Sequence, residues 1–271
     1  MITVVSLAHA QDPQFSQYYS APLYLNPGFA GITPQQRAVF NHRIQWPSLP
    51  QAFATYAASY DIFVDELRSG FGILMTTDKM GSGGWRTTTG SFIYSYKIRL
   101  TDKIVFSPGI SFGYGTNGID RTKLRLGDGL EYQRGDQYYS LDDAQSKIGR
   151  QSYFDVGSGF IFYNRSLWLG ASFMHMNRPN ISVLNDVSRL PMKTAIHGGM
   201  RLNLSGTGPG TSARISYLTP SFIYRMQGKT FSQMDLGVNY HVDPISIGLW
   251  YRGKPFETNV TNGLAQDAMI L

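Results

Sequence analysis

Histidine, serine and carboxylate residues are the side chains of this chain that could carry catalysis or hold a metal, and their spacing supports neither. The chain has five histidines: His9, His42, His175, His197 and His241. They form neither an HExxH motif nor a His-x-His pair, the spacings typical of metal sites. No serine, histidine and carboxylate set of the kind a hydrolase needs can be assigned, so a barrel enzyme is the weakest alternative. The glycine-rich stretch 206–210 lacks a Gly-Lys-Ser/Thr and a following helix, which indicates a flexible turn. We therefore expect no catalytic residues, no metal and no cofactor.

One long polar stretch, residues 118–151, carries several carboxylates among Asp-Gly, Gly-Asp and Asp-Asp steps that favour turns. Carboxylates can bind calcium, but the spacing of an EF-hand is absent, and a solvated loop is the better interpretation. We expect this loop to face outward and to contact a partner. Its candidate partner-binding residues are Asp128, Glu131, Tyr132, Asp136, Tyr138 and Tyr139.

A second set of charged residues lies on the polar face of the predicted strands. Its members are Arg37, Arg43, Asp61, Lys97, Arg99, Asp155, Arg214, Asp235 and Arg252. Because an unpaired charge in lipid is costly, we expect these side chains to line a wet or salt-bridged interior. Four of them are candidate partner-binding residues of this interior: Arg37, Arg43, Arg214 and Arg252. A specific transport site is the alternative.

The strands that must position these groups are marked by strict alternation. In 91–100, large apolar or aromatic residues occupy every second position, and after a reversal at 101–102 the pattern resumes through 115. The intervening positions of the second run are mostly Gly and Ser. A soluble sandwich would bury its bulky face and decorate the other with charge, so the bulky face is predicted to contact lipid.

The same pattern predicts about 12 antiparallel up-and-down strands, and hence a transmembrane β-barrel. Their ranges are 37–46, 51–61, 69–77, 86–100, 103–117, 152–164, 166–176, 192–204, 213–226, 230–242, 245–253 and 262–271. Long connections at 78–85, 118–151 and 177–191 fall at one end and mostly short ones at the other, as in barrels with long outer loops and short periplasmic turns. Aromatic residues near strand ends are expected at the lipid headgroups, or else in the core: Trp46, Trp85, Tyr163, Trp168, Trp250 and Tyr251.

Composition narrows the class of protein. The 271 residues show no break that would divide them into two domains, and no run of 18 apolar residues could form a membrane-spanning helix. The net charge of +6 is scattered along the chain rather than gathered in a stripe, so nucleic acid is not an expected partner. The absence of cysteine excludes disulfides, thiolate metal sites and a lipid-modified N-terminal cysteine.

The beginning of the chain differs from the rest. Residues 1–10 form a short apolar run ending in Ala-His-Ala before Gln11, which is typical of a signal-peptide cleavage site but lacks the positive start. An ordinary apolar N-terminus is the alternative. Residues 11–36 contain several aromatics and prolines without a clear period, and we expect a periplasmic segment or a plug. Residues 37–271 then form the barrel.

Several motifs extend through most of the chain. They are QDPQFSQYY at 11–19, NPGFAG at 26–31, NHRIQWP at 41–47, HGG at 197–199, LTPS at 218–221, MDLG at 234–237 and GLWYRG at 248–253. Together they resemble the PorP/SprF family, outer-membrane barrel proteins of the type IX secretion system of the Bacteroidetes. The N-terminal block is the specific part of this resemblance.

The resemblance implies an outer-membrane protein of a Gram-negative bacterium, embedded in outer-membrane lipid. It implies that the protein binds or retains secreted surface adhesins or their C-terminal sorting domains, in some members supporting gliding motility. Other secretion or peptidoglycan-linked components are further implied partners. A passive porin or hydrophobic-compound transporter is the alternative function. Family members usually continue for about two more strands to a terminal aromatic residue, so we expect about 14 strands in the complete protein, with closure of about 12 as the alternative.

Overall fold

The computed structural model describes residues 12–15, 17–48, 53–81, 84–119, 150–183, 187–204, 216–228 and 231–253, together with the backbone of 266–270. Three single helical turns precede the first strand: η1 (Tyr18–Ser20), α1 (Pro22–Leu25) and η2 (Pro27–Phe29). Pro22 and Pro27 each begin a turn, where a missing backbone N–H costs nothing. No helix in the described part of the chain is long and apolar enough to cross a membrane.

All remaining regular elements are strands of one antiparallel sheet. They are β1 (Arg37–Gln45), β2 (Phe53–Val64), β3 (Ser69–Met80), β4 (Trp85–Tyr96), β5 (Ile98–Arg99), β6 (Val105–Ile119), β7 (Arg150–Tyr163), β8 (Leu167–Met174), β9 (Lys193–Met200), β10 (Leu202–Asn203), β11 (Ser216–Gln227), β12 (Phe231–Val242), β13 (Ile245–Gly253) and β14 (Gln266–Ile270). The order along the sheet follows the chain, with β5 and β10 as short side pieces on β6 and β11. The predicted all-β, up-and-down antiparallel fold is therefore confirmed.

Two expected strands are broken in the structure. The range 86–100 divides into β4 and β5 at Lys97, and 192–204 divides into β9 and β10 at Arg201. At both breaks the backbone N–H leaves the ladder, since Lys97 N donates to Arg68 O and Arg201 N to Ser166 O. The alternation of side chains runs straight through these positions, so the pattern carries no sign of the breaks.

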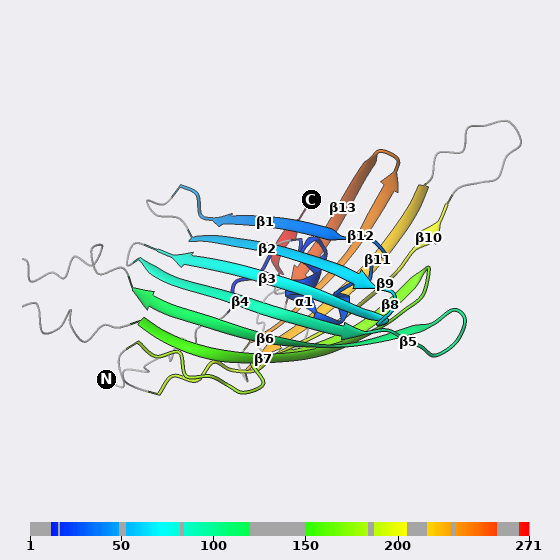
Figure 1. Cartoon of the computed structure of the whole chain (residues 1–271). Coiled ribbons are helices and arrows are strands. Elements are labelled where there is room, and N and C mark those ends of the chain that lie inside the picture. The colour runs from blue at the N-terminus through cyan, green and yellow to red at the C-terminus, as the bar shows by residue number, and fades with distance from the viewer. Residues whose placement is uncertain are drawn as a thin grey trace, which may run out of the picture.

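The sheet curves around the helical turns, which lie on its concave face (Figure 1). Among the described residues, the pairings run from β1 to β14 and include none between these two end strands. One end of the sheet carries the connections β3–β4, β6–β7 and β8–β9, and we call it the long-loop end. The opposite end, with the turns between β2 and β3, β7 and β8, and β12 and β13, is the short-turn end.

Side chains sort onto the two faces as the alternation predicts. In β4, Phe92 is 49% exposed on the convex face, whereas Ile93 and Ser95 are buried on the concave face. The apolar side chains exposed on the wall include Phe40, Ile73, Met75, Phe112, Tyr114, Phe154, Leu169, Leu236, Ile247 and Leu249. A sheet with an apolar outer face and a polar inner face is the arrangement of a membrane barrel wall.

Two residues depart from the expected positions. Trp250 is only 3% exposed and packs against Tyr18 on the concave face, so its placement among lipid headgroups was wrong and the core alternative holds. Arg99 was expected inside but is exposed, because β5 extends beyond the main ladder. In Figure 1 the β5 hairpin projects from the short-turn end of the sheet.

Candidate functional site

The interior of the curved sheet is occupied by the N-terminal part of the chain. We call residues 12–15 and 17–31 the inner segment. It begins at the long-loop end, where Asp12 contacts His175, and it ends at the short-turn end, where Gly31 contacts Asp61. Hydrogen bonds and packing with strands from both halves of the sheet hold it along this path.

Asn26 is fully buried at the centre of these contacts. Its Nδ2 lies 3.0 Å from Phe160 O, from Ala171 O and from His197 Nε2, so the amide bridges β7, β8 and β9. Its Oδ1 accepts a hydrogen bond from the Gly28 N–H at 2.8 Å, which caps η2. All polar atoms of one side chain are thereby used to fix the inner segment to the wall.

Lys97 supplies the second fixed point. Its ammonium donates to Gly28 O at 3.3 Å and to Ala30 O at 2.7 Å. It also donates to the hydroxyls of Ser107, at 2.7 Å, and Ser95, at 3.1 Å, which in turn donate to the same two carbonyls. A buried ammonium requires such partners, and here two backbone carbonyls of the inner segment provide them.

Close backbone approach explains the glycines of the NPGFAG motif. A Cβ on Gly28 would lie 2.7 Å from Ser107 O, and a Cβ on Gly31 would lie 2.7 Å from Gly70 Cα. Gly31 also has a φ of +58°, which L side chains adopt only at a cost. The motif therefore fits the inner face of the wall only with glycine at these two positions.

Ion pairs hold the short-turn end of the inner segment. Arg37 and Asp61 form a two-point ion pair, with Nε–Oδ1 at 2.9 Å and Nη2–Oδ2 at 3.1 Å. The same groups reach the inner segment, because Arg37 donates to Phe29 O and Asp61 accepts from Gly31 N. Asp61 has no exposed surface, and these donors replace the hydrogen bonds to water that a buried carboxylate loses.

A second ionic cluster lies on β11, β12 and β13. The Asp235 carboxylate accepts from the guanidinium groups of both Arg225 and Arg252. Arg252 also lies 3.5 Å from Phe15 O of the inner segment. Two guanidinium groups around one carboxylate leave this cluster with a net positive charge.

A third cluster fixes the beginning of the inner segment. The Asp12 carboxylate lies 2.7 Å from His175 Nε2 and 3.3 Å from Lys193 Nζ, and His175 Nδ1 lies 3.0 Å from Asp155. Burial disfavours the charged imidazole, but the carboxylates of Asp12 and Asp155 outweigh it and raise the pKa of His175 to about 9. His175 and Lys193 likewise overcome burial and hold the pKa of Asp12 well below its usual range. We call these four residues the latch.

Aromatic contacts fill the space between the polar anchors. Tyr18 meets Trp250 edge-on at 5.2 Å, and Tyr19 stacks on the same indole at 5.3 Å. Phe15 meets Tyr24 edge-on at 5.3 Å, and Lys193 lies 4.8 Å above the Tyr24 ring. Phe15 and Tyr18 of QDPQFSQYY are thus buried anchors of the inner segment, whereas Tyr19 covers the indole of Trp250 and stays 41% exposed.

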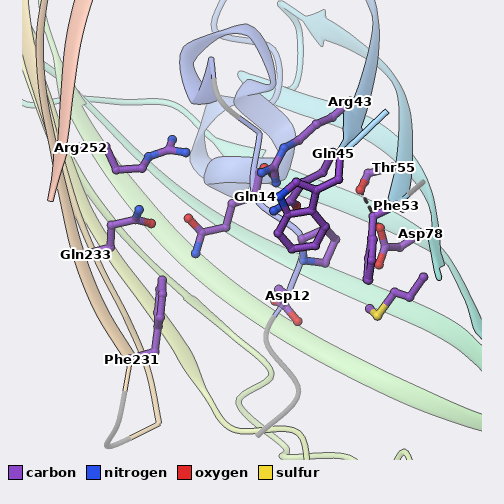
Figure 2. A pocket seen from close by; sticks show the side chains of 13 residues that line it. Asp12, Gln14, Arg43, Gln45, Phe53, Thr55, Asp78, Phe231, Gln233 and Arg252 are labelled. Carbon is purple, nitrogen blue, oxygen red and sulfur yellow. Dashed lines mark hydrogen bonds between the residues drawn. The ribbon is translucent and has the colours of Figure 1, made fainter. Parts of the chain in front are cut away.

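Space remains at the long-loop end. A cavity of about 310 Å³ opens there between the first residues of the inner segment and β1, β2, β3, β12 and β13. In Figure 2, Gln233 and Phe231 lie on one side of this cavity, and Phe53, Thr55 and Asp78 lie on the other. Arg43 also lines it and donates a hydrogen bond to Gln14 O. We call this space the mouth cavity.

The structure brings three of the four candidate arginines of the interior onto the inner segment. Arg37 contacts Phe29, Arg43 contacts Gln14 and Arg252 contacts Phe15. Their role in binding a partner stays a prediction. The remaining candidates lie outside the described residues: Arg214, Asp128, Glu131, Tyr132, Asp136, Tyr138 and Tyr139.

Sequence reasoning did not assign a role to Asn26, His175 or Asp12. The motif at 26–31 was a sufficient signal that Asn26 has a fixed position, but the latch joins residues 12, 155, 175 and 193, which no local pattern connects. Within the described part of the chain, no group of three or more His, Asp or Glu side chains is arranged to hold a metal ion.

Comparison with known protein families identifies the family of this chain. Neither the curated proteins nor the solved structures contain a match to this chain. A family model does match, and it covers nearly the whole length, from residue 7 to residue 270. Its description is type IX secretion system membrane protein PorP/SprF, in agreement with the resemblance carried by the motifs. The chain therefore belongs to the PorP/SprF family of type IX secretion system membrane proteins.

Proposed function

We propose that this protein is a non-enzymatic barrel of the outer membrane of a Gram-negative bacterium that binds or retains a secreted surface protein for the type IX secretion system. The retained protein is an adhesin, or the C-terminal sorting domain of one, of the kind that supports gliding motility in some family members. Family membership supports the place in secretion, and the apolar convex face supports the membrane position.

The observation that carries this proposal is the anchored inner segment. Asn26, Lys97 and the Arg37–Asp61 pair fix it to strands on different sides of the interior. Releasing it would leave several buried polar groups without partners, which disfavours an open pore as the resting state. Residues 11–36 are on this proposal a plug rather than a free periplasmic segment, and residues 1–10 are a signal peptide.

The two ends of the sheet then have different partners. The long-loop end faces outward, as in other membrane barrels, and presents the mouth cavity and the connection 120–149 to the secreted protein. The short-turn end faces the periplasm, where other secretion or peptidoglycan-linked components would bind. Contact with a partner through the loop residues of 128–139 belongs to this proposal.

A deletion strain and a native pull-down test the proposal together. We expect loss of at least one large secreted protein from the cell surface on deletion, and we expect mass spectrometry to find the same protein bound to the tagged barrel. Normal surface display in the deletion strain, with the barrel isolated alone, would refute it.

Planar-bilayer conductance separates the proposal from a porin or a hydrophobic-compound transporter. A plugged barrel gives no steady conductance, whereas a porin conducts when it is reconstituted alone. Steady conductance of the unmodified protein would favour the porin.

A further inference from the structure

Two arginines, Arg43 and Arg252, line the mouth cavity together with the carboxylates of Asp12 and Asp78. Arg43 projects into it from β1, and its guanidinium has five N–H donors, one of which bonds to Gln14 O. Arg252 adds the net positive charge of the cluster around Asp235. The two carboxylates already have partners. Asp12 is held by His175 and Lys193. Asp78 accepts a hydrogen bond from Thr55 at 2.6 Å and interacts with the charge of Arg43.

An unpaired acceptor also faces the cavity. Gln233 is only 7% exposed, and its Oε1 has no hydrogen-bond partner. Figure 2 shows its amide directed into the cavity from β12. Buried side-chain oxygens normally accept a hydrogen bond, so Gln233 Oε1 is available to accept one from an N–H group of a ligand.

The rim of the cavity is aromatic. Trp46, which is 53% exposed, meets Phe53 edge-on at a centroid distance of 5.2 Å, and Phe231 lines the side where Gln233 lies. Exposed aromatic side chains beside buried polar groups are typical of binding hot spots.

We propose that the mouth cavity binds a short acidic peptide segment with an aromatic residue. A carboxylate of the segment pairs with Arg43, a backbone N–H donates to Gln233 Oε1, and the aromatic side chain packs on Trp46 and Phe53. The inference rests on the proposed function and narrows it, because it names the chemistry by which a secreted protein is recognised.

A peptide fits these groups better than a sugar. A neutral oligosaccharide would stack on Trp46 and bond to Gln233, but it would bring no carboxylate to the two guanidinium groups of Arg43 and Arg252 that line the cavity. The volume of about 310 Å³ lies at the lower end of the range for ligand sites, which suits a short segment rather than a folded domain.

The binding test uses the full chain in detergent and the probe acetyl-Phe-Glu-Phe-amide, followed by saturation-transfer NMR. We expect Gln233→Leu and Arg43→Gln each to weaken binding about tenfold, the effect of losing one good hydrogen bond or ion pair. The matched controls Gln35→Leu and Arg201→Gln lie outside the cavity, are exposed, and leave binding within about twofold. A heat-dependent gel shift checks that every variant is folded.

Two further probes decide between ligands. Acetyl-Phe-Gln-Phe-amide lacks the carboxylate and is expected to bind about tenfold more weakly to the unmodified protein. Equal binding of the two peptides, or unchanged binding to Gln233→Leu, overturns the inference. Displacement of the acidic peptide by maltotriose, with tighter binding of the sugar, assigns the cavity to carbohydrate instead.

The cellular comparison keeps this inference separate from the proposed function. If the deletion strain loses a surface protein and the Gln233→Leu strain retains it fully, the proposed function stands and the cavity inference fails. If deletion has no effect on surface proteins, the proposed function fails, whatever the peptide does in detergent.

Discussion

Replacing Asn26 by alanine should release the inner segment from the wall. The amide of Asn26 makes contacts at 3.0 Å with Phe160 O, Ala171 O and His197 Nε2, and it accepts from Gly28 N at 2.8 Å. Phe160 O and Ala171 O lie on strands β7 and β8, which are paired with each other, so losing the Asn26 amide affects these carbonyls less. Gly28 N and His197 Nε2, by contrast, each lose a buried hydrogen-bond partner. At about 1–3 kcal/mol for each of these two unsatisfied buried groups, we expect the free energy of opening to fall by about 2–6 kcal/mol.

Hydrogen exchange measures this opening directly. Backbone amides of 25–31 that bond within the inner segment, such as Asn26 N and Ala30 N, exchange only when the segment leaves the interior or unwinds. A loss of 3 kcal/mol corresponds to a protection factor lower by a factor of about 100. The amides of β6 and β7 should keep their protection, because the wall is held by its own ladder.

Two asparagine variants calibrate the result. Asn41→Ala removes a single hydrogen bond to Ser20 O, so protection should fall by a factor of about 10 or less. Asn203→Ala lies in β10 on the exposed surface and should change nothing. If Asn26→Ala lowers protection no more than Asn41→Ala does, the four contacts of Asn26 do not act together and the reasoning is wrong.

Three further predictions concern the other anchors. Lys97→Met removes the donor shared by Gly28 O and Ala30 O and should lower protection of the same amides by about two orders of magnitude, while Lys103→Met in an exposed turn should not; equal protection in the two variants would contradict the role given to the ammonium. Gly31→Ala places a Cβ against Gly70 Cα at a φ of +58° and should lower the thermal stability of the folded barrel in a gel-shift assay, whereas Gly90→Ala, with nothing within 4 Å, should be neutral; a neutral Gly31→Ala would show that the wall yields. The latch should weaken with rising pH: because the pKa of His175 is raised from 6.5 to about 9, its stabilisation is complete below pH 6.5 and is lost as the pH passes 9, a change of roughly 3 kcal/mol in opening free energy. Proteolysis near residue 12 should therefore accelerate between pH 7 and 10, and His175→Gln should remove this dependence; a flat profile in the unmodified protein would contradict the ion pairing.

The sequence pattern was enough to predict the strands of the sheet, but not the contacts that fill its interior. Alternation with a period of two predicted the strands because the two faces of the sheet contact different surroundings. This difference determines which residue types alternate within each strand, so it can be read from a short stretch of sequence. The same rule placed Arg37, Arg43 and Arg252 on the inner face correctly. It could not indicate that the inner face of β13 would bury Trp250, since the partner of that indole is Tyr18, more than 200 residues earlier.

The latch shows why long-range ionic sites escape such reasoning. Asp12 and His175 are 163 residues apart, and although Asp12 belongs to the motif at 11–19, no local pattern connects it with His175. Their meeting depends on the path of the inner segment through the whole interior, which is a property of the assembled sheet. The motif at 26–31 could indicate a constrained backbone, but only the wall supplies the reason for it.

The path of the inner segment explains why the inner face of β6 carries small residues. In β6, Ser107 and Gly109 occupy alternate positions that the sequence pattern could explain only as one face of a membrane barrel. Ser107 donates to Gly28 O, and a Cβ on Gly109 would lie 2.5 Å from the carbonyl carbon of Pro27. Larger side chains at these positions would displace the inner segment, whereas an open water-filled lumen would place no limit on their size. The Gly and Ser pattern of β6 is therefore the complement of NPGFAG, and the two have to change together for the interior to stay filled.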